Sequence, residues 1–159
     1  MKKLALVFGF LICFLGGCGN SGGDNDSPGS PPDLTGEWVG TFTSNDGGAS
    51  ETITLVIVDQ NGEKILGHWD SNTLVSQGQA NGYISPINDK RWIADMDMTQ
   101  GDDITCCVPL LGCYTWPSRQ ISMSGYYNNV NGSVSIVDED ASSNYGCLIH
   151  YGTMTLTRQ

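Results

Sequence analysis

Side chains that could carry out chemistry are few in this 159-residue chain, and they do not form a catalytic set. Histidine occurs only as His68 and His150. A nucleophilic enzyme needs a histidine beside a nucleophile, with a third group that orients the imidazole. His68 alternates out of phase with Ile65 and Trp69, which predicts that it faces solvent. The sequence also has no Gly-x-Ser-x-Gly, His-Glu-x-x-His or glycine-rich phosphate loop. We therefore expect a protein that is not an enzyme and uses no cofactor.

Carboxylates are densest between Asp95 and Asp103. The spacing Asp95-x-Asp97-x-Thr99-x-Gly101 is similar to part of a calcium-binding loop. Its glycine, however, stands at the seventh position instead of the sixth, and no glutamate closes the loop. This stretch is therefore expected to be a solvated strand face that holds no metal.

The N-terminal segment has the features of an export signal. Met1-Lys2-Lys3 is followed by an apolar run from Leu4 to Leu15, which is too short to span a bilayer. Residues 15–18, Leu-Gly-Gly-Cys, resemble the lipobox of bacterial lipoprotein precursors. The resemblance implies that residues 1–17 are a signal peptide and that Cys18 becomes acylated. It also implies that the protein is anchored to the membrane in a bacterial cell envelope, in the outer membrane if the cell is Gram-negative.

The next segment, residues 19–33, is rich in Gly, Ser, Pro and Asp and has no large apolar side chain. Such a composition cannot bury enough surface to offset its ordering entropy, so it predicts a disordered tether after Cys18. Residues 34–159 then form one domain of ordinary size.

The charge balance is strongly acidic, with 17 acidic and 7 basic residues and a formal net charge of −10. Removing the signal peptide takes away Lys2 and Lys3, which leaves a formal charge of −12. An acidic surface repels phosphate, so nucleic acid is excluded as a partner.

Four cysteines remain in the domain, namely Cys106, Cys107, Cys113 and Cys147. An even number in an exported domain predicts disulfides rather than zinc ligands. In extended chain Cys106 and Cys107 point to opposite faces, so one can close the short loop to Cys113 while the other reaches Cys147. The sequence leaves open which cysteine takes which partner.

The domain alternates apolar and polar residues in short runs separated by turn residues, which predicts strands joined by hairpins. Residues Thr105–Trp116 are expected to be a disulfide-pinned loop or an irregular strand. The expected strands are Glu37–Ser44, Thr52–Asp59, Lys64–Asp70, Gln77–Ile84, Arg91–Thr99, Arg119–Tyr127, Ser133–Val137 and Cys147–Arg158.

This all-β pattern favours an up-and-down antiparallel barrel of about eight strands, because closing the sheet removes both exposed edges. A two-sheet sandwich is the alternative. Gly36-Glu37-Trp38 at the start and Leu156-Thr157-Arg158 at the end resemble the calycin superfamily of lipocalin-like and avidin-like barrels. The resemblance implies that Trp38 plugs the barrel floor and that Arg158 packs across the indole.

The function predicted from these features is binding of a small apolar or amphipathic molecule at the open end of the barrel. Aromatic and methionine side chains adapt to irregular apolar ligands, although the same residues can equally form a packed core. The alternative function is a protein-interaction or inhibitor module with a solid barrel, which docks through loops such as residues 105–116. The inward residues that would line a cavity are Trp69, Trp92, Met96, Met98, Met123 and Tyr127.

Overall fold

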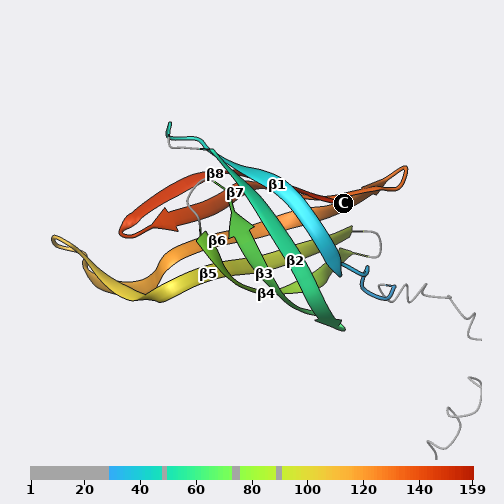
Figure 1. The fold of residues 1–159 in the computed structure, drawn as a ribbon, viewed down its shortest axis with the longest axis horizontal. Helices are drawn as coiled ribbons and strands as arrows, with labels where there is room; N and C mark the ends of the chain where they lie inside the picture. Colours follow the sequence, from blue (N-terminus) through green and yellow to red (C-terminus); the bar gives the residue numbers. More distant parts are fainter. Residues whose placement is uncertain (1–28, 48–49, 73–75, 89–90) are drawn as a thin grey trace, which may run out of the picture.

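The computed structural model describes residues 29–47, 50–72, 76–88 and 91–159, which form an eight-stranded closed barrel (Figure 1). In its described part, no helix has the length and hydropathy that a membrane crossing requires. The strands are β1 Gly36–Ser44, β2 Glu51–Asn61, β3 Lys64–Ser71, β4 Ser76–Asn88, β5 Arg91–Val108, β6 Gly112–Val130, β7 Ser133–Tyr145 and β8 Leu148–Arg158.

Each strand pairs antiparallel with the next one along the chain, and β1 pairs with β8 to close the barrel. The closing register places Trp38 opposite Arg158 and Ser44 opposite Gly152. This pairing confirms the predicted all-β barrel and excludes the sandwich. The start of β1 and the end of β8 thus lie at one end, called the floor here, and the β5–β6 and β7–β8 hairpins lie at the other, called the mouth (Figure 1).

The interior follows the period of two that the sequence indicated. Along β1, Trp38 and Phe42 are buried, while Glu37, Thr41 and Thr43 are exposed. The other strands fill the barrel with the same alternation, and their inward residues make one apolar cluster. Its largest fully buried members include Trp38, Phe42, Ile53, Leu55, Ile57, Ile65, Trp69, Ile84, Met98, Ile121 and Ile136.

Closure depends on a close approach at Gly40. A Cβ atom on this residue would lie 1.8 Å from the carbonyl oxygen of Thr155 on β8. No side chain fits at that distance, so the β1–β8 seam requires glycine at this position.

Several strands extend past the ends that the sequence indicated, β4 and β7 among them. Strand β4 continues through Pro86, which pairs with Trp92 on β5. Proline is tolerated because β3 pairs with β4 only as far as Tyr83, so the ladder on that side has already ended. Strand β7, expected to end at Val137, continues through the acidic residues 138–140 to Tyr145.

A β-bulge accommodates the acidic residues 138–140 within β7. The register with both neighbouring strands shifts there, so several backbone groups lose their ladder partners. The Asp138 carboxylate accepts hydrogen bonds from the backbone N–H groups of Ser124 and Asp140 in their place. The side chain therefore serves the fold, which accounts for its burial.

Candidate functional site

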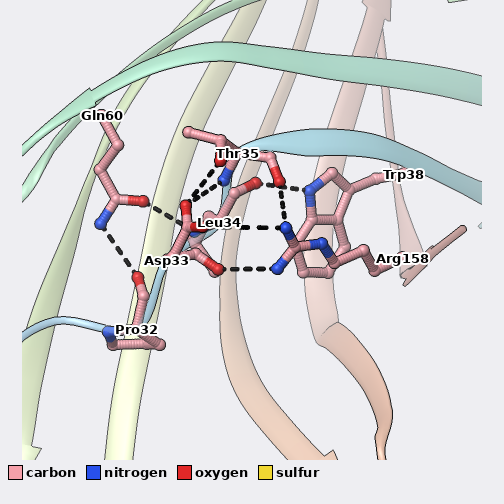
Figure 2. Close-up of polar contacts among 7 residues, drawn as sticks. All are labelled: Pro32, Asp33, Leu34, Thr35, Trp38, Gln60 and Arg158. Carbon is pink, nitrogen blue, oxygen red and sulfur yellow. Dashed lines mark hydrogen bonds and ion pairs between the residues drawn. The ribbon is translucent and has the colours of Figure 1, made fainter.

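The floor is sealed by the segment that precedes β1 (Figure 2). Leu34 is fully buried, and its carbonyl oxygen accepts a 2.8 Å hydrogen bond from the indole Nε1–H of Trp38. The Gln60 side chain donates to the Pro32 carbonyl and accepts from the Leu34 N–H. Pro32 and Asp33, which the sequence places in the tether, are therefore held against the barrel.

Arg158 also lies at the floor, where its guanidinium donates to the backbone carbonyls of Asp33 and Thr35 (Figure 2). The sequence predicts stacking on the Trp38 indole. That packing stays a prediction: Trp38 lies opposite Arg158 in the β1–β8 register. The described residues form a cation–π contact between Arg119 and Trp69, near the mouth. The floor is thus fastened mainly by hydrogen bonds to backbone carbonyls.

The Asp33 carboxylate stabilises the same turn. It accepts hydrogen bonds from the Thr35 hydroxyl and the Thr35 N–H. These two bonds, together with the nearby Arg158 charge, hold the pKa of Asp33 below its ordinary value of 3.8.

The residues expected to line a ligand cavity belong to the packed interior. Trp69, Met96, Met98 and Met123 are members of the buried apolar cluster. The two partly buried aromatic residues of the predicted set, Trp92 and Tyr127, pack against that cluster and face each other on β5 and β6. Four of the six are thus packed as in the packed-core alternative, whereas Trp92 and Tyr127 also line a hollow at the floor end beside Arg91 and Tyr126.

A different set of residues, which the sequence pattern alone does not indicate, lies at the mouth end of the interior. Arg119 is 3% exposed and forms an ion pair with Glu51, which is 6% exposed. Ser71 donates a 2.8 Å hydrogen bond to the Glu51 carboxylate, and Ser143 donates to it at 3.2 Å. We call Glu51, Ser71, Arg119 and Ser143 the mouth cluster.

The alternation of the strands places these polar side chains inside. Glu51 comes two residues before the buried Ile53, Arg119 two before Ile121, and Ser71 two after Trp69. Residues two apart on a strand face the same side, so each polar side chain continues an inward row. The cluster therefore forms the last inward layer before the loops at the mouth.

Arg119 is the centre of the cluster, and one of its three guanidinium nitrogen atoms has no partner among the described residues. Its Nη1 donates to the Ser143 hydroxyl and to the Asn144 carbonyl, and its Nη2 bonds to Glu51. Its guanidinium carbon lies 5.7 Å from the centre of the Trp69 ring. Among the residues that the structure describes, its buried Nε–H has no hydrogen-bond partner.

This arrangement has defined binding chemistry. Because Glu51 balances Arg119, the cluster carries little net charge and suits a neutral polar group better than an ion. The unused Nε–H calls for an acceptor oxygen, such as that of a carbonyl or hydroxyl group. The buried Phe42, Met98 and Ile121 belong to the apolar interior below it.

Both predicted disulfides are present, which confirms the assignment of the four cysteines and settles their partners. Cys106 bonds to Cys147, and Cys107 bonds to Cys113. The segment 105–116 is the paired end of β5 and β6, with Thr105 opposite Thr115. The first disulfide ties this hairpin to the turn between β7 and β8.

The acidic stretch lies on the outer wall, as the sequence predicts for a solvated face. Asp95 and Asp97 accept hydrogen bonds from Ser124 and Ser122 on the next strand. They line a hollow that opens on the outer wall over β4–β7. The described residues contain no group of three or more His, Cys, Asp or Glu placed to hold a metal ion.

The two histidines lie outside the mouth cluster. His68 is exposed on β3, as its phase predicts. His150 pairs with Asp46 through Nδ1 at 2.9 Å.

Among the comparisons with known proteins, the comparison of structures finds similar chains and the comparisons of sequence do not. No family model and no curated protein matches the chain. A low-affinity mutant of shwanavidin has a TM-score of 0.47 and 16% sequence identity, and the match covers 80% of this chain and 98% of that one. A mutant shwanavidin in complex with biotin has the same score and identity, with 81% and 100% covered. The assignment of this chain as a closed barrel comes from its own strand pairing.

Proposed function

We propose that this chain is a lipid-anchored, non-catalytic envelope protein whose barrel binds a small amphipathic molecule at its mouth. The observation that supports the proposal is the mouth cluster, an ion pair with two hydroxyls buried at one end of an apolar interior. The ligand's polar group would contact Arg119, and its apolar part would lie beside Phe42, Met98 and Ile121 once side chains of the mouth move apart, because these core residues are fully buried in the free protein.

The energetics favour a binding role over a stabilising one. Taking a guanidinium and a carboxylate out of water costs several kcal/mol per ion, and apolar side chains of similar volume often serve stability as well or better. Arg119 also retains an unpaired buried N–H, which costs about 1–3 kcal/mol more. A ligand oxygen that accepts from Nε would recover that free energy on binding.

The anchor in this proposal comes from the sequence alone. Residues 15–18 and the acylated Cys18 lie outside the described residues. The described chain begins at the floor, where Pro32 and Asp33 contact Gln60 and Arg158. A tether attached there would leave the mouth free for ligand.

The ligand proposal is tested by intrinsic tryptophan fluorescence. Residues 18–159 carrying Cys18→Ser, which removes the acylation site, are titrated with 1-decanol, decanoic acid, haem and biotin. We expect a saturable response to at least one probe, because Trp69 contacts Arg119. Among the two ten-carbon probes, the neutral alcohol should bind more tightly than the carboxylate at pH 8.

Two arginine variants, one at the mouth and one at the floor, show at which end of the barrel the ligand binds. Arg119→Lys keeps the charge but loses the planar fork of donors, so it should weaken binding by a factor of about ten or more. Arg91→Lys alters an exposed arginine at the floor end and should leave affinity unchanged. A barrel that responds to no probe, or a response insensitive to Arg119→Lys, would overturn the proposal.

The anchor has its own test. Wild-type protein expressed with residues 1–17 should partition into the detergent phase, and mass spectrometry should find acyl groups on Cys18. Cys18→Ser should move the protein to the aqueous phase. An unmodified Cys18 in the exported protein would contradict the anchor while leaving the ligand proposal standing.

A further inference from the structure

The end of the β5–β6 hairpin presents apolar side chains to solvent. Leu110 is 105% exposed and Leu111 is 69% exposed, at the turn between the two strands. Leu110 has a φ of 72°, a left-handed conformation that is unusual for leucine. We call residues 104–116 the hairpin tip.

The type of side chain on the hairpin tip changes in order along its length. It contains no charged residue from Ile104 to Trp116, and the nearest acids, Asp102 and Asp103, are exposed at its base. Behind the two leucines, Tyr114 and Trp116 stack with ring centres 6.4 Å apart. The order from the end inward is therefore aliphatic, aromatic and acidic.

Disulfides fix the shape of this end of the molecule. Cys107–Cys113 closes the turn that carries the leucines, and Cys106–Cys147 joins the hairpin tip to the β7–β8 turn. Leu148, Ile149 and Tyr151 are exposed just after that turn. Both hairpins project at the left end of Figure 1, opposite the floor.

We propose that the hairpin tip inserts into a lipid surface. Leucine side chains at the end would enter the acyl boundary, while Tyr114 and Trp116 would lie at the headgroup level, where amphipathic rings are favoured. The Tyr114 hydroxyl turns back toward the end and donates a 2.8 Å hydrogen bond to the Leu111 carbonyl. Trp116 lies five residues of chain behind Leu111, so the aromatic rings begin at the level of the leucine backbone and extend inward, within the roughly 5–10 Å depth of interfacial insertion. Asp102 and Asp103 would remain in water.

A lipid surface fits this tip better than a protein pocket does. Protein interfaces have polar rims with direct hydrogen bonds, and leucine is under-represented among their energetically dominant residues. The hairpin tip offers leucine at its end and no charged rim over thirteen residues. The acidic charge of the whole chain predicts a preference for neutral over anionic lipid.

This inference does not require the proposed anchor or ligand. If Cys18 is acylated, the thirteen residues of tether before Pro32 reach at most about 45 Å, so floor and tip can touch one membrane with the barrel lying along it. An amphipathic ligand could then reach the mouth from the bilayer.

The test is flotation with phosphatidylcholine vesicles, using residues 18–159 with Cys18→Ser so that no acyl chain is present. We expect the protein to float with the vesicles and to do so less when phosphatidylglycerol is included. The double variant Leu110→Ser/Leu111→Ser should lose at least tenfold in partition coefficient. Val58→Ser and Val130→Ser change side chains that are 62% and 65% exposed elsewhere, and should bind like wild type.

Brominated phosphatidylcholine supplies a second readout, since it should quench wild-type fluorescence and quench Trp116→Phe less. No flotation, or flotation that the leucine variant leaves intact, would overturn the proposal. Leucine-dependent self-association in sedimentation without flotation would also overturn it and would make the tip a protein interface. Ligand titrations should be unchanged in the leucine variant, which separates this proposal from the proposed function.

Discussion

At the scale of single residues, the unusual feature of this barrel is a charged pair where core residues would serve stability better. Arg119 and Glu51 are both buried, and each has further hydrogen bonds that hold it in place. The sequence contained the signal, because both residues continue inward rows of alternating strands. The burial of the pair is nevertheless not expected from the sequence, because Glu51 lies just before the expected strand that starts at Thr52, and Arg119 is the first residue of its expected strand. A charged residue at the end of a strand is usually solvated.

The pair gives a direct prediction for stability. Arg119→Met leaves the Glu51 carboxylate buried without its counter-charge, and should lower the free energy of unfolding by about 3–5 kcal/mol. The double variant Arg119→Met/Glu51→Met should recover most of that loss. Urea denaturation monitored by circular dichroism measures both, and a single variant that costs less than about 1 kcal/mol would contradict burial of the pair.

Asp33 gives a prediction about pH. Its pKa is lower in the folded chain than its ordinary 3.8, so its contribution to stability is fully present above pH 3.8. The contribution is lost as the pH falls through the lowered folded value. Asp33→Asn should therefore destabilise the fold slightly at pH 7, and the gap to wild type should shrink in urea titrations below pH 3.8. A gap that widens in acid would contradict the assigned hydrogen bonds.

At the scale of elements, turns and bulges account for most differences between prediction and structure. Asn131 and Gly132 both have positive φ, as a type I′ hairpin turn requires. The Asn-Gly dipeptide at residues 61–62 takes a different position in its hairpin. Asn61 is the last residue of β2 and pairs with Lys64, so the two-residue loop is Gly62–Glu63. The β7 bulge was not predictable, because acidic residues favour a turn locally and the neighbouring strand supplies the Ser124 N–H that bonds to the Asp138 carboxylate.

The two disulfides should contribute unequally to stability. The loop that each closes differs in length, with sequence separations of 41 for Cys106–Cys147 and 6 for Cys107–Cys113. Loop-closure entropy predicts losses of about 4 and about 2 kcal/mol for the two Cys→Ser double variants. Denaturation of each variant beside wild type checks the order, and a larger loss from the short loop would contradict the entropic account.

At the scale of the whole molecule, closure of the barrel was predictable because many short strands without a helix leave few other ways to protect two sheet edges. Whether the inward aromatic and methionine residues line a cavity or fill a core was not predictable, because the same residue types fit both. Only the three-dimensional structure shows that the predicted residues, such as Met98 and Trp69, are packed in the core.

Closure itself can be tested at the β1–β8 seam. Gly40→Ala places a methyl group 1.8 Å from the Thr155 carbonyl oxygen, so the strands must separate. We expect a loss of about 3 kcal/mol or more in the free energy of unfolding. Thr41→Ala, on the exposed face of the same strand, should cost about 0.5 kcal/mol or less. Equal effects of the two changes would contradict the closed seam.

The measurement that most directly tests the binding account is nuclear magnetic resonance of the arginine side chains. The chain has three arginines, so Arg119→Lys assigns the Nε–H signal of the mouth cluster unambiguously. In the free protein this buried proton should exchange slowly with solvent, and saturation with the tightest of the fluorescence probes should shift its resonance downfield as an acceptor oxygen binds. An Arg119 signal that is unchanged at saturation, while the Arg91 or Arg158 signal moves, would contradict a ligand site at the mouth.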